Sequence, residues 1–481
     1  MENESLKKKA IRGVSWSFVD NIASQGITFL VGIILARLLS PAEFGILGMI
    51  TIFIAISNSI IDSGFSNALI RKNDAKRIDY NTVFIFNLVL SLVLYGVLYV
   101  ASPAISRFFH EPQLVAITRV MGLLLLINAL GIIQRTLLVK RVDFKTQTKV
   151  SVIASLGSAV VGVGMAWAGF GVWSLVGQQL SRQFLNTLFL WVFNRWRPLL
   201  EFSIQSFKEL FSFGSKLLAS GLIDTLFKNI YYIIIGRFYS AAQLGQYTRA
   251  EQFNMIFSSN LTSVIQRVSY PVLSSIQNEA ERLREAYRRV IKSTMLVAFA
   301  CMLGLAACAK PVILILIGEK WLVAAEYLQI LCFSGMLYPL HAINLNILQV
   351  KGRSDLFLKL EIIKKGLAVL PITLGIIYGI KVMLLAKVFN SFLAYYLNAR
   401  YSKSMVNYSV KEQIADILPT FLVSLGVAGV MWGITWLDLN VYLQLIVQVS
   451  VGLTLAGVIY EKLNLEEYKE LKGIALSILK R

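Results

Sequence analysis

The chain has few of the residues that build disulfide frameworks and metal centres, with three cysteines and two histidines among 481 residues. The cysteines Cys301, Cys308 and Cys332 all lie in apolar runs, which is typical of buried thiols and excludes a disulfide framework. CxxC and HExxH patterns are missing, so we expect no metal site and no bound cofactor. GxGxxG and Walker patterns are missing too, which excludes direct use of ATP by this chain.

Charged residues are also scarce, at 15% of the chain, whereas about a quarter is usual for a soluble domain. Hydrophobic residues make up 56%, and the mean hydropathy is +0.65. Runs such as 84–105 are long enough to cross about 30 Å of hydrocarbon. The sequence therefore predicts an all-α polytopic membrane protein with about fourteen transmembrane helices. Their approximate limits are 14–38, 43–69, 80–105, 114–138, 148–169, 172–193, 211–236, 246–270, 291–317, 322–350, 359–379, 382–404, 415–436 and 441–460.

The formal net charge of +20 comes from 47 basic and 27 acidic residues, and its distribution argues against a nucleic-acid partner. Lys and Arg gather in every second connection, for example at 71–77, 135–149 and 281–292, as the positive-inside rule requires. We therefore expect the basic connections to face anionic membrane lipids on the cytoplasmic side. Both ends of the chain are predicted to be cytoplasmic.

One short stretch occurs twice, as ARLLSPAEFGILGM at 36–49 and as GRFYSAAQLGQYTR at 236–249. An even number of predicted spans separates the copies, so both turns have the same orientation in the membrane. Ser40 and Gly45, which recur as Ser240 and Gly245, are interpreted as a helix cap and a close-packing position.

A weaker similarity follows in the same order along the chain, between 137–145 and 348–359. The sequence thus predicts two pseudo-symmetric six-helix lobes, 1–198 and 199–405, and two extra C-terminal helices within 406–481. We expect 199–211 to form an interfacial linker helix and the tail after 462 to be a cytoplasmic amphipathic helix.

The stretches "SWSFVDNIASQGITFLVGIILARLLSPAEFG" and "LLVKRVDFK" resemble Wzx-type lipid-linked oligosaccharide flippases, particularly the colanic-acid exporter subgroup. These proteins form the polysaccharide-transporter branch of the MOP exporter superfamily. The resemblance implies a MOP/MATE-like fold in the bacterial inner membrane. It also implies translocation of undecaprenyl-pyrophosphate-linked oligosaccharide to the periplasmic leaflet by alternating access, for surface polysaccharide synthesis. Polymerase and chain-length components of the pathway are the implied partners.

Other functions stay open at this point. A multidrug antiporter of the same superfamily needs an acidic cavity, whereas basic residues outnumber acidic ones among the deep charges here. A flippase for the peptidoglycan precursor lipid II fits the span number equally well. A membrane polymerase or glycosyltransferase fits least, because the predicted extracytoplasmic connections are short and carry no paired acids. We therefore expect a transporter and not an enzyme.

Ionisable residues inside membrane spans are costly and are functional candidates by default. Arg182 lies in the polar stretch VGQQLSRQFLN, where its forked guanidinium suits either pyrophosphate or an interhelical clamp. Asp224 and Lys228, four residues apart, either neutralise each other or meet the cargo. The predicted cavity residues are Arg182, Asp224, Lys228, Arg119, Arg249 and Arg267. The predicted coupling or gating residues are Asp20, Asp62 and Glu251.

Overall fold

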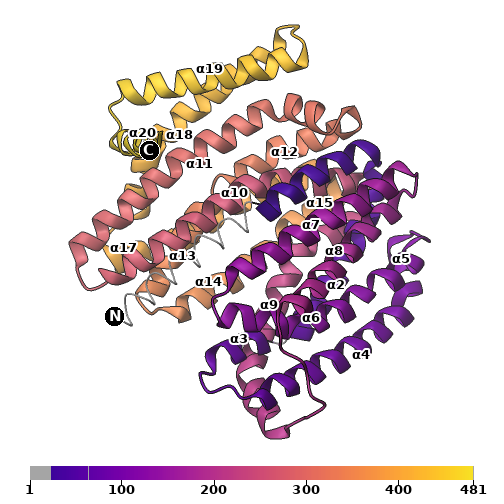
Figure 1. The fold of residues 1–481 in the computed structure, drawn as a ribbon. Helices are drawn as coiled ribbons and strands as arrows, with labels where there is room; N and C mark the ends of the chain where they lie inside the picture. The colour runs from indigo at the N-terminus through magenta and orange to yellow at the C-terminus, as the bar shows by residue number, and fades with distance from the viewer. Residues whose placement is uncertain (1–22, 63, 480–481) are drawn as a thin grey trace. The chain divides into compact units, whose positions relative to one another are not determined.

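The computed structural model describes residues 23–62 and 64–479, and within them every regular element is helical (Figure 1). This confirms the predicted all-α fold. A helix at Ala23–Leu38 comes first. The others are α2 (Pro41–Asp62), α3 (Phe65–Arg71), α4 (Arg77–Phe109), α5 (Leu114–Met121), α6 (Leu123–Lys140), α7 (Phe144–Trp167), α8 (Val172–Phe193), α9 (Ile204–Phe238), α10 (Ala241–Ser275), α11 (Ala280–Leu316), η1 (Glu319–Trp321), α12 (Leu322–Gly335), α13 (Tyr338–Val350), α14 (Ser354–Leu367), α15 (Val369–Tyr378), α16 (Ile380–Ala399), α17 (Ser402–Val406), α18 (Val410–Gly433), η2 (Ile434–Trp436), α19 (Val441–Lys462) and α20 (Glu466–Leu479).

Among the described residues, 10 helical segments are long and apolar enough to cross a membrane. The remaining predicted spans fall on the helix Ala23–Leu38, on α8, on α10 and on the pair α14–α15. The helices α8 and α10 carry many polar side chains, as expected of helices that bury polar groups within a bundle. The helical segments are thus consistent with the predicted fourteen spans.

The chain divides into two compact units, Met1–Gly245 and Gln246–Arg481. In the first unit α7 packs along α8, α2 along α9, and α6 between α4 and α8. Its apolar core includes Phe65, Phe84, Ile133 and Leu210. The boundary between the two units along the chain falls within α10, after Gly245. The predicted boundary between the lobes is at 198/199, and the predicted lobes stay predictions.

The segment before span 7 is helical, and its place at the membrane interface stays a prediction. Residues from Ile204 onward continue into span 7 as the single helix α9. Phe207 of this first part packs on the apolar core of the first unit. Glu209 accepts a hydrogen bond of 2.9 Å from Lys72, and this bond raises the pKa of the Lys72 amine. The segment is therefore anchored to the first unit by contacts with α3 and α4.

In the second unit, α11 packs against α12, α18 and α19, which lie beside it in the orange and yellow part of Figure 1. Arg288 of α11 binds both carboxylate oxygens of Asp416 of α18, at 2.5 and 2.6 Å. The tail helix α20 also packs on α11, where Lys292 pairs with Glu467. The C-terminal spans and the tail are therefore joined to this unit by charge pairs.

Both copies of the repeated turn form the predicted helix cap. Glu43 accepts hydrogen bonds from the Ser40 backbone N–H at 2.6 Å and from its hydroxyl at 2.9 Å. In the second copy, the Ser240 N–H donates to Gln243 at 3.3 Å, and the Gln243 N–H donates to the Ser240 hydroxyl at 3.2 Å. Each turn therefore satisfies backbone donors at the start of a helix, in the manner of a capping box.

The two copies also pack against each other reciprocally. A Cβ added to Gly45 of α2 would lie 1.7 Å from the carbonyl oxygen of Ala241, the first residue of α10. A Cβ added to Gly245 of α10 would lie 1.8 Å from the carbonyl oxygen of Pro41, the first residue of α2. Only glycine permits this approach, so the close-packing role predicted for Gly45 applies to both copies.

Candidate functional site

Asp224 and Lys228 form an ion pair of 2.7 Å on α9, one helical turn apart. Their side chains are 48% and 66% exposed, although both lie inside a helix long and apolar enough to span a membrane. Ionised groups in such spans face a bundle interior or a water-filled cavity and avoid hydrocarbon. The two opposite charges are therefore exposed together on one face of α9.

In the second unit, Glu251 of α10 lies 3.2 Å from Lys387 of α16 and forms an ion pair. Their side chains are 13% and 22% exposed, and the Lys387 amine also lies 3.4 Å from the hydroxyl of Tyr247. Arg249 is more deeply buried, at 8% exposure, where it donates to Gln252 and lies over the ring of Trp321. Glu251 thus pairs with Lys387, whereas Arg249 contacts Gln252 and Trp321, so the two residues do not form one site.

The other predicted residues are dispersed. Arg119 donates to the hydroxyl of Ser102 at 3.1 Å and lies 4.3 Å from the ring centre of Tyr99, so it joins α5 to α4. Arg267 lies on the exposed side of α10 in the second unit. Asp20 falls outside the described residues. The predicted candidates therefore do not form one cluster.

Asp62 ends α2 and accepts a hydrogen bond of 2.5 Å from the hydroxyl of Ser66. Ser66 in turn lies 3.2 Å from the hydroxyl of Thr136 on α6. The carboxylate also attracts the guanidinium of Arg135, the preceding residue of α6. Asp62 is thus the acidic end of a polar strip between α2, α3 and α6.

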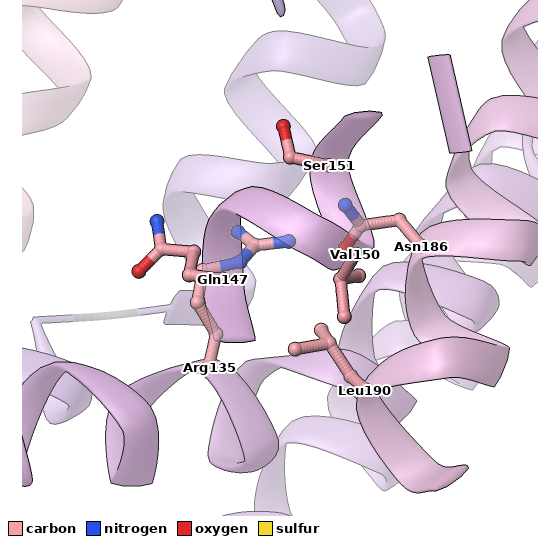
Figure 2. Close-up of a pocket in the computed structure, with 6 residues that line it drawn as sticks. All are labelled: Arg135, Gln147, Val150, Ser151, Asn186 and Leu190. Carbon is pink, nitrogen blue, oxygen red and sulfur yellow. The ribbon is translucent and has the colours of Figure 1, made fainter. Parts of the chain in front are cut away.

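Arg135 lines a cavity of about 260 Å³ between α6, α7 and α8, which we call the α6–α8 pocket (Figure 2). In Figure 2 its guanidinium points from α6 toward the side chains of α7 and α8. The amide oxygens of Gln147 and Asn186 are buried and accept no hydrogen bond from the described residues. The full lining is Arg135, Gln147, Val150, Ser151, Asn186 and Leu190.

Arg182 lies half-buried on α8, one turn before Asn186, so the two residues share a face of the helix. Its neighbour Gln183 donates to Asn128 at 3.2 Å, and Asn128 donates to Asn58 of α2 at 2.8 Å. The polar stretch predicted around Arg182 therefore divides between a bonded network across α2, α6 and α8 and the α6–α8 pocket.

Sequence reasoning misses Arg135 and Gln147 as site residues because both fall within 135–149, a basic stretch that the charge pattern assigns to the cytoplasmic side. The structure places Arg135 inside α6, five residues before its end at Lys140. A usable signal was present, since Gln147 and Ser151 are four apart and mark a polar face on α7.

An all-helical chain with long apolar spans, and with ion pairs and polar pockets among those spans, has the features of a multi-pass membrane transporter. The chain matches the model of the polysaccharide biosynthesis protein family over residues 34–326 and belongs to that family.

Two curated relatives and one solved structure extend this assignment. The lipopolysaccharide biosynthesis protein WzxC of Escherichia coli is 25% identical, with 89% of each chain covered. The succinoglycan biosynthesis transport protein ExoT of Rhizobium meliloti is 28% identical, with 69% of this chain and 67% of ExoT covered.

The fold resembles that of the lipid II flippase MurJ in an inward closed conformation, with a TM-score of 0.74 and 14% identity. The alignment covers 95% of this chain and 100% of the MurJ chain. The predicted resemblance to polysaccharide flippases and the MOP-like fold are thereby confirmed. The chain is a transport protein of polysaccharide biosynthesis and not an enzyme.

Proposed function

We propose that the chain moves an undecaprenyl-pyrophosphate-linked oligosaccharide from the cytoplasmic to the periplasmic leaflet, for assembly of a surface polysaccharide. The observation that carries this proposal is the exposed Asp224–Lys228 pair within the span formed by α9. Such a pair requires water at membrane depth, and a sugar-pyrophosphate headgroup needs the same aqueous passage. The family and its polysaccharide-pathway relatives support this cargo class.

The negative charge of a pyrophosphate cargo is complementary to the positive side chains in the spans. A pyrophosphate is best held by guanidinium forks and ammonium groups, which form short, charge-assisted hydrogen bonds with its oxygens. Lys228 and Arg182 lie in α9 and α8 of the same unit and are the cations that we assign to the passage. A polymerase and chain-length components then consume the delivered repeat units.

The reciprocal contact at Gly45 and Gly245 supports alternating access. On the positive-inside orientation these helix starts lie at the periplasmic face, and their close approach closes that face. Nearby, Gly236 of α9 packs against Phe109 of α4, and Arg237 lies 2.8 Å from a ring nitrogen of His110. We assign these contacts to a periplasmic gate that separates when cargo is released.

We also propose that the protein lies in the bacterial inner membrane and, on the same orientation, has both ends in the cytoplasm. Reporter fusions test it. Fusions after Lys76 and Arg400 are expected to read as cytoplasmic, and fusions after Glu43 and Glu111 as periplasmic. A periplasmic signal after Lys76 or Arg400 would contradict the orientation.

The cargo is tested by deleting the gene in the cells that carry it. We expect surface polysaccharide to be lost and the lipid-linked repeat unit to accumulate, inaccessible to a glycosidase added to spheroplasts. Restoring the gene should reverse both effects. Normal export in the deletion strain would refute the proposal. If the gene instead rescued depletion of a lipid II flippase, or only raised drug resistance, it would belong to one of the alternative transporter classes.

A further inference from the structure

The α6–α8 pocket contains a cation, Arg135, without a hydrogen-bond partner in the part of the chain that the structure describes. Arg135 carries five N–H donors and a permanent charge, yet it makes no hydrogen bond with any residue that the structure describes. Asp62 attracts the guanidinium without a hydrogen bond to it. Arg135 is half-buried, so its donors are available to an acceptor that enters the pocket.

Two amides that line the pocket, one on α7 and one on α8, have the complementary need. The buried amide oxygens of Gln147 and Asn186 lack donors among the described residues. A phosphate group offers acceptor oxygens and therefore suits Arg135, but it offers no donor for these two amide oxygens. Sugar hydroxyls both donate and accept, so they suit an amide in either orientation.

Size and apolar lining complete the match. The volume of about 260 Å³ is many times the ~30 Å³ that one water molecule takes in the liquid. Val150 and Leu190 give the pocket an apolar wall, which suits the C–H face of a pyranose ring. Each half of a glycosyl phosphate thus has a chemical counterpart.

The depth of the pocket is appropriate for a headgroup. Arg135 precedes the end of α6 by five residues, and Gln147 follows the start of α7 by three. At 1.5 Å per residue, both lie within about 8 Å of the helix ends. On the positive-inside orientation those ends face the cytoplasm, where a lipid-linked cargo is loaded.

We propose that the α6–α8 pocket binds the phosphate and first sugar of a lipid-linked glycosyl phosphate before translocation. Arg135 holds the phosphate, and Gln147 and Asn186 hold the sugar hydroxyls. This inference rests on the proposed function and assigns it a loading site outside the α9 ion pair.

The test measures binding to the purified full-length chain in phosphatidylcholine nanodiscs. The probes are an undecaprenyl-pyrophosphate-linked disaccharide, undecaprenyl pyrophosphate and phosphatidylglycerol. Arg135→Gln is expected to weaken binding of the glycosylated probe at least tenfold. Arg141→Gln is the matched control, because Arg141 lies exposed just after α6, and this variant is expected to bind like the unmodified chain.

Gln147→Glu separates binding from a structural role. The new carboxylate gives Arg135 a partner within the pocket, so we expect a higher Tm together with at least tenfold weaker binding. A higher Tm with unchanged binding would overturn the proposal. Equal affinity for phosphatidylglycerol and the glycosylated probe would overturn the sugar contacts.

The outcomes also separate this inference from the proposed function. If the unmodified chain binds the glycosylated probe and both pocket variants bind it equally well, only the loading site is wrong. If the unmodified chain binds no glycosylated probe and the deletion strain exports normally, the proposed function itself fails.

Discussion

Replacing Gly45 with alanine inserts one methyl group between α2 and the first turn of α10. The new Cβ would lie 1.7 Å from the Ala241 carbonyl oxygen, where ordinary van der Waals contact begins at 3.4 Å. The backbones therefore have to part by about 1.7 Å, because a carbonyl within a helix has no rotamer through which to yield. Overpacking of this kind typically costs about 1–3 kcal/mol, and we expect the upper end here.

That cost falls only on the state in which the two helix starts are in contact. A cost of about 3 kcal/mol changes the ratio of closed to open molecules by roughly a hundredfold, since about 1.4 kcal/mol corresponds to a factor of ten. Spin labels at Leu38 and Phe238, which are exposed at the ends of their helices, report the separation in a background without native cysteines. We expect Gly45→Ala to lengthen the distance between the labels, to lower Tm and to reduce export.

Gly96→Ala is the matched control, since a Cβ at Gly96 of α4 meets nothing within 4 Å. The double variant Gly45→Ala/Gly245→Ala adds a second test. Either substitution alone already separates the pair, so the double variant should cost less than the sum of the single variants. Equal Tm and label distances in Gly45→Ala and Gly96→Ala would refute the reasoning.

Three further predictions concern the ionised side chains. Asp224→Asn and Lys228→Met should each change stability by less than about 1 kcal/mol, because the pair is half exposed or more, yet the double variant should remain inactive in export at normal abundance. Recovered export in the double variant would show that the two charges only neutralise each other. Arg182→Ala should abolish export with the protein still folded in the membrane, and Arg182→Lys should rescue only partly because the fork is lost. Loss of folded protein would favour an interhelical clamp. Glu251→Gln should lower Tm because the half-buried Lys387 amine loses its carboxylate partner, at a cost of about 1.5–3 kcal/mol, and adding Lys387→Met should restore part of it. A thermal melt unchanged in Glu251→Gln would contradict a stabilising pair.

Local patterns predicted much of the fold. Apolar runs between charged breaks located the helices because both the run and its boundaries are read within some twenty residues. The Asp224–Lys228 pair was predictable for the same reason, since residues four apart on a helix are neighbours. The Ser40 cap likewise depends on a contact only three residues away.

Contacts between distant residues were not predictable. Glu251 was recognised as a deep charge, but its partner Lys387 comes from α16, 136 residues later. Arg135 lies where the predicted span 114–138 overlaps the basic stretch 135–149, and sequence alone does not show that its side chain lines a pocket. The core packing of Phe207 similarly depends on α3 and α4, which its own amphipathic pattern does not specify.

The repeated turn shows how one constraint can act at two positions. Because the copies share an orientation, each presents a helix start and, four residues later, a glycine to the other copy. A side chain at either glycine would meet a backbone carbonyl, at 1.7 Å from Gly45 and 1.8 Å from Gly245, so neither position accepts a larger residue while the contact exists. The helix cap accepts either an acid or an amide, because both Glu43 and Gln243 supply an oxygen to the backbone N–H of the serine three residues earlier. The glycines are therefore explained by the contact between the copies, and the acid and amide by the helix cap within each copy.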